Sequence, residues 1–312
     1  MTVWPSPVPC SVDVNGIPMS GLLSEAPDPR AIVVAIHGGA TTSAYFDCPG
    51  HPRLSLLRLG TALGFTAIAL DRPGFGSSAP HADKMDDPQR RVGLAYAAVD
   101  EILGSRPRGA GLFVLAHSAG CELALRMAAD ERGSQLLGLE IAGTGRRHQP
   151  AARDVLRRPE LSDVRKGVRE LLWQTAHLYP TEVIDGAVRG SWSPAYEATV
   201  VANWSKRDFL ALAAQVHIPT RFSLADHEQF WEAGAAGLAD VAAVFTASPR
   251  VVVNQQHDSP HNLSLGWTAA AYHLGVLSFV EECAVAGESR TGGETVPDVA
   301  GRPAPEIDSE AS

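Results

Sequence analysis

The chain has 312 residues, of which 45% are hydrophobic, and its formal net charge is -9. This length exceeds what one simple core accommodates and predicts either one large domain with an insertion or one and a half domains. The acidic balance argues against a nucleic-acid partner, because neutralising phosphates requires an excess of Lys and Arg. We find no apolar run that approaches the roughly 20 residues needed to cross a bilayer. The N-terminus, residues 1–9, lacks the basic and apolar regions of a signal peptide, so we expect no signal peptide and, with no spanning run, no membrane partner.

The four cysteines lie far apart in the sequence and include no Cys-x-x-Cys pair. They are Cys10, Cys48, Cys121 and Cys283. This spacing predicts reduced thiols, a cytoplasmic location and no structural zinc site. We expect no cofactor, and the sequence leaves open whether the chain forms a homodimer.

The predicted elements alternate between strands and helices. Residues 11–15 and 17–22 are expected to pair as a hairpin, because Asn15-Gly16 is a strong two-residue turn signal. Further strands are predicted at residues 31–36, 65–70, 111–115, 136–142, 219–224 and 251–254, and helices at 52–64, 89–103, 121–129 and 265–283. This alternation predicts an α/β fold with a mostly parallel sheet flanked by helices.

The alternation stops between residues 146 and 217, where helical and irregular segments follow one another without a buried strand. This segment predicts a helical cap inserted into a core made of residues 1–145 and 218–283. The last residues, 284–312, are rich in Gly, Pro, Ser and Glu. Such a composition is typical of a disordered acidic tail.

Ser118 lies between a predicted buried strand and a predicted Ala-rich helix. It is the centre of the sequence AHSAG at residues 116–120, a small-x-Ser-x-small pattern. A tight strand-to-helix turn presents a serine hydroxyl in isolation, and small neighbours are needed because the turn is crowded. The pattern therefore indicates a nucleophilic serine. The alternative interpretation is a serine that caps the following helix.

Together with this serine motif, two further segments give the chain a resemblance to the α/β-hydrolase family over about residues 11–283. Residues 37–39 read HGG and resemble the oxyanion-hole motif of that family, and residues 71–77 read DRPGFGS and resemble the loop after its next strand. The resemblance implies the α/β-hydrolase fold with an inserted cap. It also implies oxyanion donors at Gly39 and Ala119, with Ala40 as the near alternative to Gly39.

The resemblance implies a catalytic histidine in the loop before the last helix. His257 and His261 both lie there, and His261 fits the position better, which leaves His257 as a pocket or structural residue. Their i, i+4 spacing would suit zinc on a helix, but Pro260 indicates a loop and no third ligand stands out, so we predict no metal site.

The resemblance also implies an acid after the preceding strand, which would orient the histidine. Aligning Ala225 with a glycine that is common in the family places the acid at Glu228. Asp226 is the alternative.

The predicted cap carries aromatic side chains that suggest an apolar pocket between cap and sheet. The residues assigned to that pocket are Trp173, Trp192, Trp204, His37, His117 and His257. Structural roles are an equally valid interpretation of the tryptophans, and His37 is expected to be structural rather than catalytic. Residues 146–217 include basic pairs such as Arg146-Arg147, which suggest a solvated helix face or a docking surface for a phosphopantetheine carrier, CoA or a substrate carboxylate.

Three functions are compatible with these residues. The first is a serine hydrolase that cleaves an ester or thioester of a small-molecule or carrier-bound acyl group through an acyl-enzyme on Ser118. The second is an acyltransferase or cyclase of natural-product biosynthesis in which an alcohol or amine intercepts the same intermediate. The third is a ligand-binding protein without catalytic activity on the same scaffold. The intact serine, histidine and acid pattern favours an enzyme.

Overall fold

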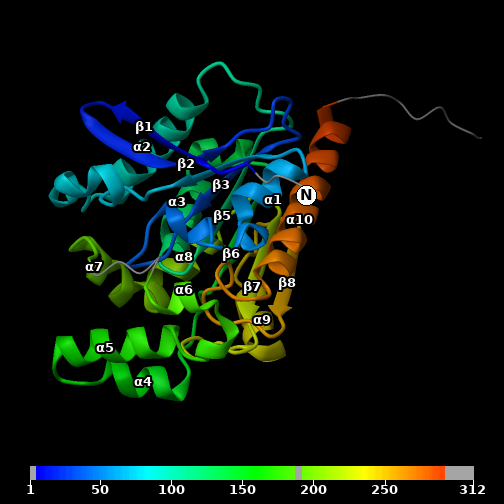
Figure 1. The fold of residues 1–312 in the computed structure, drawn as a ribbon. Coiled ribbons are helices and arrows are strands. Elements are labelled where there is room, and N and C mark those ends of the chain that lie inside the picture. The colour runs from blue at the N-terminus through cyan, green and yellow to red at the C-terminus, as the bar shows by residue number, and fades with distance from the viewer. Residues whose placement is uncertain (1–4, 187–191, 292–312) are drawn as a thin grey trace, which may run out of the picture.

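The computed structural model describes the whole chain except residues 1–4, 187–191 and 292–312. Its centre is an eight-stranded sheet with the strand order β1-β2-β4-β3-β5-β6-β7-β8 (Figure 1). The strands are β1 (Val8–Val14), β2 (Ile17–Ser24), β3 (Ile32–Ile36), β4 (Thr66–Leu70), β5 (Leu112–His117), β6 (Gly138–Ala142), β7 (Thr220–Ala225) and β8 (Val251–Gln256).

The sheet is antiparallel at one edge and parallel elsewhere. Strands β1 and β2 form the predicted hairpin, in which Asn15 and Gly16 have φ angles of 53° and 77°. Two successive positive φ values are typical of a type I′ turn, which explains the strength of the Asn-Gly signal. Strand β2 pairs antiparallel with β4, and all pairings from β4 to β8 are parallel. The carboxyl ends of the parallel strands therefore meet at one edge of the sheet.

Helices cover both faces of this sheet. One face packs on α2 (Pro88–Leu103), α3 (Gly120–Ala129) and α9 (Gly234–Ala242), and the other packs on α1 (Leu56–Ala62) and α10 (Ala269–Thr291). Every residue of β3 and β4 is buried, and alternate side chains belong to the two separate cores. This burial on both faces explains why the central strands are continuous apolar runs.

The described part of the predicted insertion consists of short helices joined by irregular segments, with no strand of the sheet. Its helices are α4 (Pro150–Leu156), α5 (Leu161–Leu172), η5 (Ala176–Leu178), α6 (Thr181–Ile184), α7 (Tyr196–Asn203), the π-helical turn η6 (Trp204–Asp208) and α8 (Phe209–Ala213). Helices α4 and α5 pack together at the lower end of the molecule in Figure 1, while α8 packs against α3. We call residues 146–217 the cap.

Short 3₁₀ turns complete the described elements: η1 (Ser43–Phe46), η2 (Pro52–Leu54), η3 (Gly76–Lys84) and η4 (Glu131–Gln135). The single helix predicted over residues 52–64 is therefore divided into η2 and α1. Ser55 separates them, and its hydroxyl accepts the Arg58 N–H as the cap of α1. A serine that caps a helix ends the preceding turn because its own backbone is extended.

The last helix is longer than predicted. Helix α10 continues to Thr291, eight residues beyond the expected end at Cys283, so the predicted tail begins too early. Ala284 is buried in this extension, and Arg30 binds the carboxylates of Glu281 and Glu288, which lie about two turns apart on one side of the helix. The remainder of the predicted tail, residues 292–312, lies outside the described residues.

Helix α10 is also the one described helix that is long and apolar enough, by length and composition, to cross a membrane. Half of the relevant window, Ala269–Ser289, is buried inside this protein. Tyr272, Val276 and Val280 of this helix belong to the core under the sheet. Burial against a sheet accounts for the apolar character of the helix.

Candidate active site

Ser118 lies at a sharp turn between β5 and α3. Its φ angle is +50°, a left-handed conformation that is uncommon for a residue with a side chain, and its N–H donates to the Ala142 carbonyl at 2.8 Å. The turn leaves no space next to the serine, because a Cβ on Gly120 would lie 2.4 Å from the His37 carbonyl oxygen. These contacts explain the small residues of the AHSAG motif. The strained backbone presents a half-buried serine at the carboxyl edge of the sheet.

His261 lies between Ser118 and a buried carboxylate. Its Nε2 is 3.3 Å from Ser118 Oγ, and its Nδ1 is 2.7 Å from Glu228 Oε2. The three predicted residues come from three separate loops, after β5, β7 and β8, that meet at one edge of the sheet. A separation of 3.3 Å is typical of catalytic serine–histidine pairs before substrate arrives.

Glu228 is buried and has several hydrogen-bond partners. Its Oε1 accepts the backbone N–H groups of Phe230 at 2.8 Å and Trp231 at 3.3 Å, while its Oε2 faces His261. Burial raises the pKa of this carboxyl, but the His261 charge, its hydrogen bond and the two N–H groups outweigh burial and leave the pKa below its usual value. Glu228 is therefore ionised at neutral pH and fixes the Nδ1 proton on His261.

The structure corrects the alternative assignments. Asp226 does not contact His261; its carboxylate accepts the backbone N–H groups of Asp258 at 2.9 Å and Ser259 at 3.0 Å. His257 is not a pocket residue, because its side chain is 84% exposed and lies 3.6 Å from Asp226. Asp226 thus stabilises the turn before His261, in which Asp258 has a φ angle of +48°.

The glycine-rich loop after β3 lies against the serine turn. A Cβ on Gly38 would be 3.2 Å from Ser118 Cβ, and one on Gly39 would be 3.7 Å from Ala119 Cβ. Gly39 and Ala119, the two predicted oxyanion donors, are therefore neighbours beside Ser118. Ala40, the alternative, has a φ angle of +50° at the turn that follows.

His37 and His117 are buried and act as fixed hydrogen-bonding groups. His37 Nδ1 donates to the Gly38 carbonyl at 2.8 Å, and its Nε2 accepts the Arg72 N–H at 3.1 Å. His117 Nε2 donates to the His261 carbonyl at 2.9 Å. Burial holds the pKa of both imidazoles well below the usual value, so both rings are neutral. Their buried positions and backbone contacts make them supports of the site rather than residues of an open pocket.

The cap tryptophans occupy three different environments. Trp204 is a core residue, contrary to the pocket prediction, because it stacks on Phe209 and its N–H donates to Thr144 Oγ1 at 2.8 Å. Trp173 is half-buried and packs on Tyr179. Trp192 is 48% exposed, and its ring lies 5.9 Å from that of Phe75. Of the three, Trp192 is the most accessible.

The cap contacts the histidine loop directly. Asn262, the residue after His261, donates from Nδ2 to Tyr179 Oη at 3.0 Å and to the Leu172 carbonyl at 3.1 Å. The Trp267 N–H donates to the Leu178 carbonyl at 2.9 Å. Sequence reasoning noted Tyr179 only as one of the aromatic residues of the cap and did not predict its contact with Asn262. Their pairing joins positions 83 residues apart, and neither residue carries a motif.

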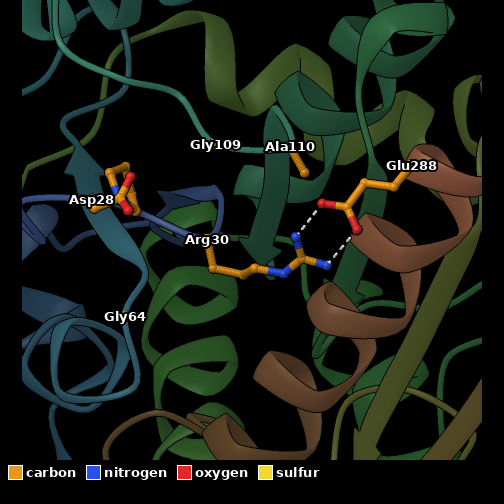
Figure 2. A pocket seen from close by; sticks show the side chains of 7 residues that line it. Asp28, Arg30, Gly64, Gly109, Ala110 and Glu288 are labelled. Atoms are coloured by element: carbon orange, nitrogen blue, oxygen red, sulfur yellow. Dashed lines mark hydrogen bonds and ion pairs between the residues drawn. The ribbon is translucent and has the colours of Figure 1, made fainter. Parts of the chain in front are cut away.

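Two cavities are prominent, and neither includes Ser118. The first, of about 360 Å³, is lined by Arg30, Gly64, Gly109 and Glu288, among others (Figure 2). Arg30, Gly64 and Gly109 precede parallel strands, so this cavity lies at the edge opposite the serine. The second, of about 370 Å³, lies between α2, α3 and α7, where Arg91 and Arg126 bind Glu122.

One described group of side chains has the composition of a metal site. Ligand atoms of Asp226, His227 and Asp258 lie within 4.8 Å of one another. The Asp226 carboxylate already accepts two backbone N–H groups in this turn, and these bonds account for its position close to Asp258.

The basic pair Arg146-Arg147 of the cap forms ion pairs with Asp240, so part of the positive charge of the pair is neutralised.

Comparison with known proteins identifies the family. A family model described as the alpha/beta hydrolase family matches residues 33–293. The chain belongs to the alpha/beta hydrolase family. Members of this family are generally hydrolytic enzymes, and the eight-stranded, mostly parallel sheet flanked by helices is their fold. No curated protein matches this sequence.

Solved structures of alpha/beta hydrolases are similar to this chain at low identity. A thermostable carboxyl esterase from Bacillus coagulans is 18% identical, with a TM-score of 0.62, covering 89% of this chain and 99% of that one. A thioesterase domain from the curacin biosynthetic pathway is 17% identical, with a TM-score of 0.57 and coverages of 88% and 100%. A proline iminopeptidase from Mycobacterium smegmatis is 16% identical, with a TM-score of 0.59 and coverages of 89% and 99%. These similarities establish the shared fold.

Proposed function

We propose that this alpha/beta hydrolase is a serine hydrolase that cleaves a carboxylic ester or thioester through an acyl-enzyme on Ser118. The observation that carries the proposal is the hydrogen-bonded chain from Ser118 through His261 to Glu228. A serine is a weak nucleophile until a neighbouring base accepts its proton. In this protein the base is His261, whose Nε2 faces Ser118 Oγ and whose Nδ1 is hydrogen-bonded to the ionised carboxylate of Glu228.

In the first half-reaction Ser118 Oγ attacks the substrate carbonyl carbon, and its proton passes to His261 Nε2. Glu228 stabilises the resulting imidazolium without accepting a proton itself. The carbonyl oxygen gains negative charge, which the N–H groups of Gly39 and Ala119 would stabilise as donors. The C–O or C–S bond then breaks, and His261 returns the proton to the leaving alcohol or thiol.

In the second half-reaction a water molecule replaces the leaving group. His261 accepts a proton from this water as its oxygen attacks the acyl-enzyme carbonyl, and the same two N–H groups stabilise the second oxyanion. Collapse of this intermediate releases the carboxylic acid, and His261 protonates Ser118 Oγ. The proposed substrate is a small-molecule or carrier-bound acyl compound.

Labelling with a fluorophosphonate probe tests the nucleophile. We expect the native protein to be labelled once, at Ser118, and to hydrolyse p-nitrophenyl esters. Ser118→Ala should abolish labelling and lower kcat by about 10³-fold or more, leaving only residual catalysis. The matched control is Ser134→Ala, because Ser134 is exposed and its hydroxyl donates to the Glu131 carbonyl far from the site.

Two results would contradict the proposal. Full turnover by Ser118→Ala would show that another group performs the reaction. Absence of both labelling and turnover in the native protein would favour a ligand-binding protein instead.

Mass spectrometry of the products separates hydrolysis from acyl transfer when hydroxylamine or glycerol is added as a competing nucleophile. Only transfer yields a hydroxamate or acylglycerol as the main product.

A further inference from the structure

Arg72 is a buried arginine in the loop after β4, and its side chain contacts the glycine-rich loop after β3. Its Nη2 donates to the Gly38 carbonyl at 2.8 Å, and its backbone N–H donates to His37 Nε2 at 3.1 Å. The guanidinium carbon lies 4.3 Å from the centre of the Phe75 ring. A buried charge of this kind is costly unless the structure uses its hydrogen bonds.

The Gly38 carbonyl belongs to the same planar peptide as the Gly39 N–H. Two donors approach this carbonyl oxygen, Arg72 Nη2 and His37 Nδ1, both at 2.8 Å. Because the peptide is rigid, fixing its oxygen fixes the direction of the N–H at its other end. Hydrogen bonds to the oxygen also polarise the peptide and strengthen its N–H as a donor.

Glu197 of the cap helix α7 completes the arrangement. Its Oε1 binds Arg72 Nη2, and both side chains are buried. Its second oxygen, Oε2, is 3.5 Å from the position that a Cβ on Gly39 would occupy. A cap residue therefore balances the arginine's charge and lies next to the glycine-rich loop after β3, residues 37–40, which we call the oxyanion loop.

We infer that Arg72 is a positioning residue for the oxyanion hole, which orients and polarises the Gly38–Gly39 peptide, and that Glu197 of the cap holds it in place. The inference rests on the proposed serine-hydrolase function. It adds that transition-state stabilisation depends on a cap residue. In this arrangement neither Arg72 nor Glu197 touches the reacting atoms, since both act through the Gly39 N–H.

A positioning role affects the tetrahedral state more than substrate binding. Loss of a whole oxyanion donor costs about 10²- to 10³-fold in kcat, so misdirecting one should cost about 10- to 100-fold. We therefore expect Arg72→Met to lower kcat for p-nitrophenyl butyrate by about this factor, with KM changed less than about threefold. The dissociation constant of phenylboronic acid, which forms a tetrahedral adduct with serine, should rise by the same factor as kcat falls.

Two milder variants keep the test informative if Arg72→Met folds poorly. Arg72→Lys retains the charge but not the planar fork, and should lose activity partially. Glu197→Gln retains an acceptor oxygen for Arg72 without the charge, and should lower kcat less than Arg72→Met does. The control is Arg221→Met, which breaks another buried pair, Arg221–Glu140, on the sheet. It should lower the melting temperature while kcat and the boronate dissociation constant stay unchanged.

The outcomes distinguish the inference from the proposed function. If the native protein hydrolyses esters and Arg72→Met retains native kcat and boronate affinity, the positioning role is wrong and the hydrolase function stands. If kcat and KM both change in Arg72→Met while boronate affinity is preserved, Arg72 only maintains the fold. If the native protein neither turns over esters nor binds the boronate, both the function and the inference fail.

Discussion

His261 Nδ1 and Glu228 Oε2 are 2.7 Å apart, and both side chains are almost completely buried. Replacing the carboxylate by an amide in Glu228→Gln should favour the wrong histidine tautomer and remove the stabilisation of the imidazolium. By comparison with other triad enzymes, we expect kcat to fall by about 10³- to 10⁴-fold with little change in KM. Steady-state hydrolysis of p-nitrophenyl esters measures this effect.

Asp226→Asn is the matched control for this carboxylate, because Asp226 is two residues away and bonded to the backbone of the turn at Asp258 and Ser259. An asparagine oxygen can still accept one of those N–H groups. We expect kcat to fall less than about tenfold, since the effect on His261 is indirect. A larger loss in Asp226→Asn than in Glu228→Gln would mean that the acid is assigned to the wrong residue.

Gly120 allows the serine turn to pack against β3. A methyl group there would lie 2.4 Å from the His37 carbonyl oxygen and 2.8 Å from that of Ile36, both backbone atoms. Gly120→Ala should therefore lower the free energy of unfolding by about 2–3 kcal/mol. It should also suppress turnover, because the displaced backbone belongs to the oxyanion loop. Urea denaturation and ester hydrolysis measure the two effects.

Gly93→Ala is the control for Gly120→Ala. Gly93 lies inside α2, and a Cβ there would meet no other atom within 4 Å. Alanine has the higher helix propensity, so Gly93→Ala should raise the free energy of unfolding by about 0.5–1 kcal/mol and leave turnover unchanged. Equal destabilisation by both substitutions would show that the crowding at Gly120 has no special importance.

His273 makes stability depend on pH. It is buried against Ser264, and burial lowers its pKa to about 3. Between the unfolded value of about 6.5 and this folded value, only the unfolded chain binds the proton, so stability present at neutral pH is lost as the pH falls. From pH 7 to pH 5 this single histidine should cost about 2 kcal/mol of unfolding free energy.

Urea denaturation at the two pH values checks this prediction. His273→Gln removes the titrating group, so the difference between pH 7 and pH 5 should shrink by about 2 kcal/mol whatever the variant's overall stability. Buried His37 and His117 retain their own contribution of the same sign. An unchanged difference in His273→Gln would show that this histidine is protonated in the folded protein.

The end of α10 should contribute to stability. A chain ending at Cys283 lacks the buried Ala284 and the Arg30–Glu288 contact, which a chain ending at Thr291 retains. We expect the melting temperature of the shorter chain to be about 2–4 °C lower. Arg30→Met in the longer chain is the control, because it removes the ion pair but keeps the last turns. Identical melting of the two truncated chains would contradict the structural role of residues 284–291.

Local patterns predicted most of the fold. The apolar runs of the central strands and the Asn15-Gly16 turn are determined by neighbouring residues, so the sequence alone indicated them. The end of α10 was missed because its contacts are distant in sequence, such as the one with Arg30, more than 250 positions away along the chain. A composition rich in small and charged residues does not distinguish a helix held by a distant partner from a disordered tail.

The candidate site also combines residues that local sequence patterns predict with residues whose roles depend on distant partners. Ser118, His261 and Glu228 were predicted because each follows a strand in a recognisable order, and the structure brings them within hydrogen-bonding distance. Trp204 and His257 were placed in a pocket because residue type cannot show whether an aromatic ring faces a core, a cavity or solvent. Arg72 and Glu197 were not recognised as partners, since a pair joined across 125 positions leaves no local pattern.

The cap contacts both sides of the Ser118 site, through Glu197 to Arg72 in the loop after β4 and through Tyr179 to Asn262 in the histidine loop. The cap and these two loops therefore form one packed unit rather than interchangeable modules. A chimera that replaces residues 146–217 with the cap of a related enzyme must provide, at positions 197 and 179, side chains that pair with Arg72 and Asn262. Directed evolution of substrate range would therefore succeed sooner at exposed cap positions such as Trp192 than by exchange of the entire segment.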